Sequence, residues 1–78
     1  MIGRYPSEAE RFVLSYPSVA DRPIHMVGVR RPLMVTWLAD GEVTKQTVAR
    51  PWVGGGSATA DTIIEERPTE EQLRRYRE

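Results

Sequence analysis

The sequence lacks cysteine and contains a single histidine, His25. The absence of cysteine excludes disulfide bonds and thiolate metal sites, and one histidine leaves no convincing set of zinc ligands. The chain has 78 residues, enough for one domain at most, and a domain of this size buries only about 60% of its unfolded surface. Small domains without disulfides or metals often rely on a partner or on self-association for stability. The absences alone therefore favour a binding protein.

The sequence also lacks a net charge and a long apolar run. Lys and Arg together number 11, as do Asp and Glu, so no net charge draws the protein to nucleic acid or to an anionic membrane. No apolar run approaches the roughly 18 residues of a membrane span, and the first residues lack the apolar block of a secretory signal. Because a chain without cysteine also fits a reducing compartment, we expect a cytoplasmic protein with no membrane partner.

The first element predicted from what is present is a helix over residues 8–15. Ser7 and Glu10 have the spacing of a capping box, in which each side chain accepts a hydrogen bond from the backbone N–H of the other residue. Pro17 disfavours helical geometry at the residue before it and so ends the helix. Apolar side chains form one stripe at helical spacing: Ala9, Phe12, Val13 and Tyr16.

A β-hairpin is the strongest local signal, after an expected loop over residues 18–23 and a short strand over 24–29. Asp40-Gly41 lies between the β-rich runs 33–39 and 42–49, and Asp-Gly is a preferred pair for a two-residue hairpin turn. The first run is apolar on both faces, as in a central strand, while the second is polar, as in an edge strand. A two-residue turn gives these facing pairs: Leu38 with Val43, and Trp37 with Thr44. A three-residue loop would change this register.

The C-terminal part contains a connector and a second helix signal. Residues 54–60 are rich in glycine and small side chains, which is typical of a flexible connector, and residues 62–65 form at most a short strand. Thr69 and Gln72 have capping-box spacing. Acid–arginine pairs then follow four residues apart: Glu70 with Arg74, and Glu71 with Arg75. A short helix is therefore expected at the end of the chain.

Together these elements predict a small α+β fold. It comprises the N-terminal helix, an antiparallel sheet of two to four strands centred on the hairpin over residues 33–49, and the short C-terminal helix. Residues 1–53 would form the compact domain. Residues 54–78 would form a flexible Gly-rich connector and a charged C-terminal segment that packs on this domain or folds on a partner.

No catalytic, metal-binding or cofactor-binding residue is predicted. His25 lies between Ile24 and Met26, where a half-buried strand residue is expected, and nothing identifies a neighbour that would orient it as a general base. A cysteine nucleophile is absent, and the serines cannot be assembled into a triad from sequence. The run 54–57, Gly-Gly-Gly-Ser, lacks the spacing and the lysine of a phosphate-binding loop. The sequence therefore predicts that the protein is not an enzyme.

Basic and aromatic side chains near the hairpin, and the apolar side chains of the last helix, are the predicted contact residues: Arg30, Arg31, Lys45, Arg50, Trp52, Leu73 and Tyr76. Protein interfaces concentrate their binding energy in Trp, Tyr and Arg. Trp52 follows Arg50-Pro51 and precedes the glycine run. Exposure at an interface and closure of the small core are therefore both open for this side chain.

We expect from these features a non-enzymatic protein-binding accessory module. It would act as a subunit, adaptor or inhibitor of a larger protein or assembly, with self-association as another way to cover the sheet. The alternative is a nucleic-acid-binding protein that uses the basic β-hairpin, because a cationic hairpin with aromatic side chains can follow a phosphate backbone and stack bases. The zero net charge argues against this alternative.

Overall fold

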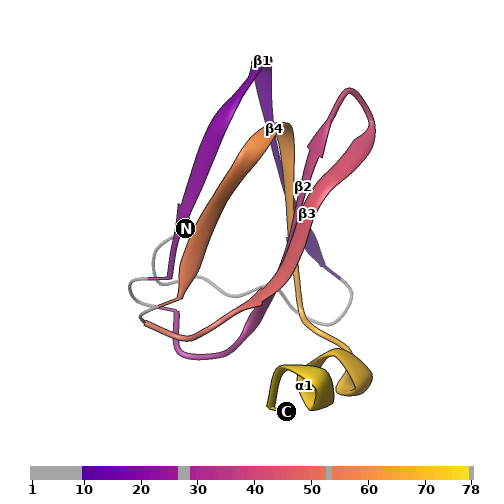
Figure 1. Ribbon diagram of the computed structural model, residues 1–78. Coiled ribbons are helices and arrows are strands. Elements are labelled where there is room, and N and C mark those ends of the chain that lie inside the picture. Colours follow the sequence, from indigo (N-terminus) through magenta and orange to yellow (C-terminus); the bar gives the residue numbers. More distant parts are fainter. Residues whose placement is uncertain (1–9, 27–28, 53, 78) are drawn as a thin grey trace.

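The computed structural model describes residues 10–26, 29–52 and 54–77. Its elements are β1 Arg11–His25, β2 Leu33–Ala39, β3 Glu42–Ala49, β4 Gly55–Glu66 and α1 Glu70–Arg77. The strands form one antiparallel sheet in the spatial order β1-β4-β2-β3 (Figure 1). The predicted α+β class with an N-terminal helix is therefore wrong. The described chain is mostly antiparallel sheet, and the one helix in it is the short C-terminal one.

The segment predicted to form the N-terminal helix is instead the start of β1. Residues 11–15 pair with the end of β4, while Ser7 of the expected capping box lies outside the described residues. The apolar side chains of Phe12, Leu14 and Tyr16 fit a period of two, and so short a run fits the helical period equally well. The segment forms a strand and not a helix because its pairing with β4 satisfies the backbone hydrogen bonds along the edge of β4 that faces away from β2.

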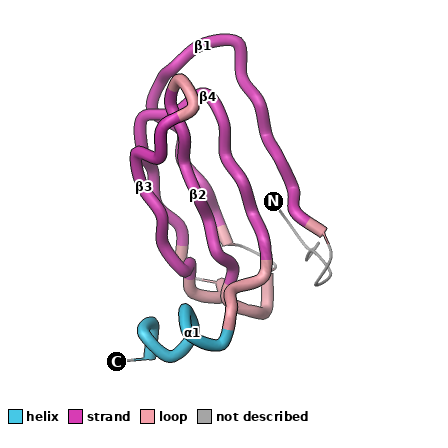
Figure 2. Tube along the Cα trace, turned by 90° about the vertical axis from the view of Figure 1, so that its right-hand side faces the viewer, coloured by secondary structure: helices cyan, strands magenta, loops and turns pink. Residues whose placement is uncertain are grey.

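β1 and β4 are long strands that bend back over the rest of the sheet. Their register shifts after Ser15 of β1, and such an irregularity bends a strand sharply. Beyond it, the second half of β1 pairs with the first half of β4, as far as His25 opposite Gly55. Figures 1 and 2 show the result, a sheet folded into two layers. Residues 18–23, predicted to be a loop, are therefore part of β1. The strand expected over residues 24–29 contributes only its first two residues to β1, and residues 27–28 lie outside the described part.

Residues 54–60 were predicted to be a flexible connector, but all of them except Gly54 belong to β4. Gly55 has a φ of 150°, in a region that residues with a side chain rarely adopt. A Cβ on Gly55 would collide with the carbonyl oxygen of Ile24, and a Cβ on Gly54 would collide with the backbone of Arg50. The glycines therefore allow two backbone segments to approach closely. Composition alone does not distinguish this role from flexibility.

The predicted hairpin is confirmed at its turn. Asp40 and Gly41 have φ angles of 52° and 82°, as a two-residue turn of this kind requires. Leu38 faces Val43, as expected. β2 is a central strand and β3 an edge strand, which matches the apolar character of the first and the polar character of the second.

A β-bulge next to the turn contradicts the second facing pair. Trp37 lies opposite Lys45, so Thr44, the expected partner, is the extra residue of the bulge. The hydroxyl of Thr44 donates a hydrogen bond of 2.7 Å to the carbonyl oxygen of Thr59 in β4. This bond links β3 to the folded-over half of β4 and joins the two layers at one side.

The core lies between the two layers and is centred on Trp37, which is fully buried. The side chains packed around it come from all four strands and from the segments next to them: Ile24, Met26, Val29, Leu33, Val35, Ala49, Ala60 and Ile63. The opposite face of β2 is covered as well, since Met34 and Thr36 are buried. We call this opposite face the outer face.

The predicted C-terminal helix and its capping box are confirmed. The backbone N–H of Thr69 donates to the side-chain oxygen of Gln72 at 2.8 Å, and the N–H of Gln72 donates to the Thr69 hydroxyl at 3.1 Å. Arg75 and Glu71 form the expected ion pair, with 2.8 Å between nitrogen and oxygen. α1 lies at the end of the sheet (Figure 1), next to the outer face of the hairpin.

Candidate functional site

Four of the seven predicted contact residues lie together at one end of the sheet. This end, the base, is where β2 begins and β3 ends, because Leu33 pairs with Ala49. The hairpin turn marks the opposite end, the tip. The residues at the base are Arg30, Arg31, Arg50 and Trp52. We call them the Trp–Arg surface, and all four side chains are exposed.

Trp52 is the apolar centre of the Trp–Arg surface. Its backbone N–H donates a hydrogen bond of 3.1 Å to the carbonyl oxygen of Val29. The residue has a φ of 63°, a conformation that is rare for a bulky side chain and costs on the order of 1–3 kcal/mol. The side chain is 52% exposed. The backbone therefore presents this aromatic side chain to solvent, and of the two alternatives left open by the sequence, closure of the core is not the one observed.

The backbone path at the base brings the three arginines near Trp52. Arg30 and Arg31 directly follow the residue that accepts the Trp52 hydrogen bond, and Arg50 precedes Trp52 by two residues. A second backbone hydrogen bond, of 3.0 Å from the N–H of Gly54 to the carbonyl oxygen of Arg50, closes the turn. Guanidinium groups bind carboxylates through two parallel hydrogen bonds. The Trp–Arg surface is thus suited to an apolar group surrounded by carboxylates.

The other three predicted contact residues lie elsewhere. The Nζ of Lys45 lies 5.4 Å from the ring centroid of Trp37 and donates a hydrogen bond of 3.4 Å to the carbonyl oxygen of Ser57. The Lys45 side chain therefore lies on the sheet itself, between β2 and the first half of β4, and not at the base. Leu73 is half-buried in α1, and the side chain of Tyr76 lies outside the described part. The structure does not bring all seven residues to one surface.

An open groove of about 460 Å³ adjoins the Trp–Arg surface. It is lined by the end of β1 and by the glycine run: Pro23, Ile24, His25 and Gly54–Ser57. The two segments pair with each other as strands, and His25 is the one titratable side chain of the lining.

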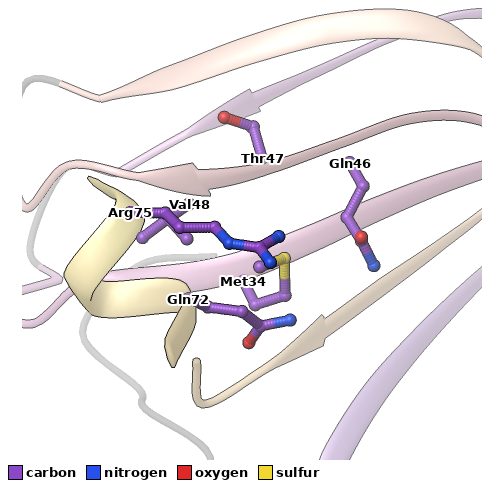
Figure 3. A pocket seen from close by; sticks show the side chains of 6 residues that line it. All are labelled: Met34, Gln46, Thr47, Val48, Gln72 and Arg75. Carbon is purple, nitrogen blue, oxygen red and sulfur yellow. The ribbon is translucent and has the colours of Figure 1, made fainter. Parts of the chain in front are cut away.

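A second groove, of about 320 Å³, lies between α1 and the outer face of the hairpin (Figure 3). Its lining residues are Met34, Gln46, Thr47, Val48, Gln72 and Arg75. Figure 3 shows the Arg75 side chain extending from α1 over Met34. Arg75 is already paired with Glu71, and the Gln46 amide donates a hydrogen bond of 2.9 Å to the Thr36 hydroxyl. Two polar groups of this groove are thus engaged within the chain.

One buried carboxyl group was missed by sequence reasoning. Glu65 is 1% exposed, its Oε2 has no hydrogen-bond partner, and strand pairing places it between Val35 and Phe12. Loss of hydration raises the pKa of Glu65 above its ordinary value, because burial disfavours the charged form. Its alternation with Ile63 along one face of β4 is the signal that could have indicated burial.

Within the described residues, no group of three or more His, Asp or Glu side chains could hold a metal ion. No helix in the same part of the chain is long and apolar enough to cross a membrane. Comparisons with protein-family models, with curated proteins and with solved structures found no match.

Proposed function

We propose that this protein is a non-enzymatic protein-binding module and that the Trp–Arg surface is its contact surface. The observation that carries the proposal is Trp52, which a backbone hydrogen bond holds in a strained conformation with half of its side chain exposed. Strain of this kind persists where the surroundings enforce it, and it concentrates at functional positions. Trp beside Arg is also the composition in which interface energy concentrates. A role as accessory subunit, adaptor or inhibitor fits such a module.

The partner is proposed to present carboxylates together with an apolar group. Backbone hydrogen bonds before and after Trp52 hold the base in place, so little conformational entropy is lost on binding. The apolar group would pack against the indole, and the carboxylates would bind the guanidinium groups near it. An acidic protein surface with an exposed apolar side chain has both features.

Nucleic acid is the weaker candidate. The hairpin surface expected to bind it combines Lys45 with the arginines, but Lys45 lies against the ring of Trp37, away from the base. What remains is three arginines and one aromatic side chain, in a chain with a net charge of zero. A nucleic-acid footprint is typically a larger basic patch or stripe.

Capture from native lysate by the tagged chain, with and without nuclease, tests the proposal. A stoichiometric protein partner that survives nuclease treatment is expected. Arg30→Glu with Arg31→Glu should lose this partner, because reversed charges repel carboxylates. Arg74→Glu makes the same kind of charge change on α1, also at an exposed position, and should retain it. Loss of every partner with nuclease, or equal capture by all three proteins, would sink the proposal.

A further inference from the structure

The tip of the hairpin carries an exposed apolar residue next to acidic residues. Val43 is 59% exposed, more than any other large apolar side chain in the described residues. Asp40 and Glu42 are exposed beside it. The backbone N–H of Asp40 donates a hydrogen bond of 3.4 Å to Oδ2 of Asp61, which brings a third carboxylate to the turn. We call these four residues the tip surface.

The tip surface is the counterpart of the Trp–Arg surface. Each has one exposed apolar side chain, Val43 at the tip and Trp52 at the base. Each also has three charged residues that the backbone brings near it, which are acids at the tip and arginines at the base. An acidic turn alone would indicate no ligand. The match in both charge and apolar centre is what indicates one, because complementary charges select and orient a partner.

The two surfaces cannot meet within one molecule. They lie at opposite ends of the hairpin, since Ala39 pairs with Glu42 at the tip and Leu33 with Ala49 at the base. β3 has eight residues, and a strand of that length spans roughly 25 Å. A contact between the two surfaces is therefore a contact between two copies.

We propose that the tip surface of one copy docks on the Trp–Arg surface of a second copy. This inference rests on the proposed function and names the partner of the same site. The acids of the tip pair with the arginines of the base, and Val43 packs against Trp52. A head-to-tail contact uses different patches on the two copies, so one copy keeps an unused base and the other an unused tip. Association then continues into rings or open chains.

Sedimentation velocity of the full chain, with two complementary variants, tests the inference. The tip variant is Glu42→Lys with Val43→Lys, and the base variant is Arg30→Glu with Trp52→Ala. All four side chains are exposed, and lysine is well tolerated on an edge strand. The wild type is expected to form species that grow with protein concentration. These should dissociate as salt rises from about 0.1 M to about 1 M, since the screening length falls from about 10 Å to about 3 Å.

The two variants give different results alone and together. Each variant alone should associate at least about tenfold more weakly than the wild type, because one of its two surfaces is lost. An equimolar mixture should form a heterodimer and nothing larger, because one intact tip and one intact base remain. Arg74→Glu is the matched control and should associate like the wild type. If circular dichroism shows a variant to be unfolded, Glu42→Gln or Arg30→Gln replaces it, with a weaker effect in the same direction.

Two results would overturn the head-to-tail contact. One is a wild-type chain that stays monomeric at about 1 mM, and the other is association that both variants retain. If the Trp–Arg surface still captures another protein in that case, the proposed function stands without this partner. If the base variant changes neither self-association nor capture, both proposals fail.

Discussion

The indole Nε1 of Trp37 donates a hydrogen bond of 2.8 Å to the backbone carbonyl oxygen of Arg22. Trp37 belongs to the central strand β2, and Arg22 belongs to the part of β1 that folds back over it. The bond therefore crosses the core and connects the two layers. The guanidinium of Arg22 also lies 4.0 Å from the ring centroid of Tyr16, at the bend of β1. One buried side chain thus anchors the return of β1 over the sheet.

Trp37→Phe should destabilise the fold substantially. The change keeps an aromatic ring in the core but removes the indole N–H, so the Arg22 carbonyl loses its partner and a cavity remains. We expect the free energy of unfolding to fall by about 2–4 kcal/mol, measured by urea unfolding. Trp52→Phe is the matched control, and at an exposed position it should change stability by no more than about 0.5 kcal/mol. Equal losses in the two variants would contradict the anchoring role of Trp37.

Gly55→Ala should destabilise the fold more than Gly41→Ala. Both glycines have positive φ angles, of 150° and 82°, so each alanine costs about 1–2 kcal/mol in backbone strain. A Cβ on Gly55 also collides with the carbonyl oxygen of Ile24, whereas nothing lies within 4 Å of a Cβ on Gly41. Thermal unfolding of both variants measures the difference. A smaller loss at Gly55 would mean that β1 and β4 do not approach closely there.

Glu65 should make the protein less stable as the pH rises. Burial raises the pKa of Glu65 above its ordinary value of 4.5 in the folded state. Between the unfolded and folded pKa values, the folded state binds more protons than the unfolded state, so the free energy of unfolding decreases with rising pH. The penalty is absent below the unfolded pKa and complete above the folded pKa. Glu65→Gln removes this titration and should gain stability relative to the wild type as the pH rises from below the unfolded pKa to above the folded pKa. Urea unfolding across that range tests this, and a difference that does not vary with pH would contradict it.

Thr69→Ala should loosen α1 without unfolding the sheet. The change removes the hydroxyl that accepts the N–H of Gln72, and loss of such a cap costs about 1 kcal/mol. Since α1 has only eight residues, it is marginal without its cap. We expect amide exchange over residues 70–77 to become about fivefold faster, with unchanged rates in β2 and β4. Faster exchange throughout the sheet would show that α1 is needed for the whole fold.

Local signals in the sequence were sufficient at the hairpin turn and at the C-terminal helix. The Asp40-Gly41 turn and the Thr69–Gln72 capping box each involve residues within three positions of one another, so their interpretation needs no distant strand. The pairing of Trp37 with Thr44 failed by one residue because of a bulge. The bulge depends on a partner that sequence spacing does not reveal, the carbonyl of Thr59 in β4.

Distant backbone neighbours explain the larger errors. The run from Phe12 to Tyr16 fits either a helix or a strand, and pairing with β4, far along the chain, makes it a strand. The glycine run fits either a flexible connector or a close approach of two backbone segments. The carbonyl oxygen of Ile24, which leaves no room for a Cβ on Gly55, shows that the second interpretation is correct. The candidate site shows the same division. Residue type indicated both Trp52 and Lys45 as contact residues, and only the fold shows that Trp52 lies at the base while Lys45 lies against Trp37.

Partner capture by a variant changed only at Trp52 tests the Trp–Arg surface most directly. Val13 provides the matched control, because its side chain is 55% exposed and lies in β1. Trp52→Ala should reduce the partner recovered from nuclease-treated lysate at least about tenfold, as expected for an interface hot spot, while Val13→Ala should leave recovery unchanged. Equal recovery by the two variants would contradict the assignment of this surface as the contact site.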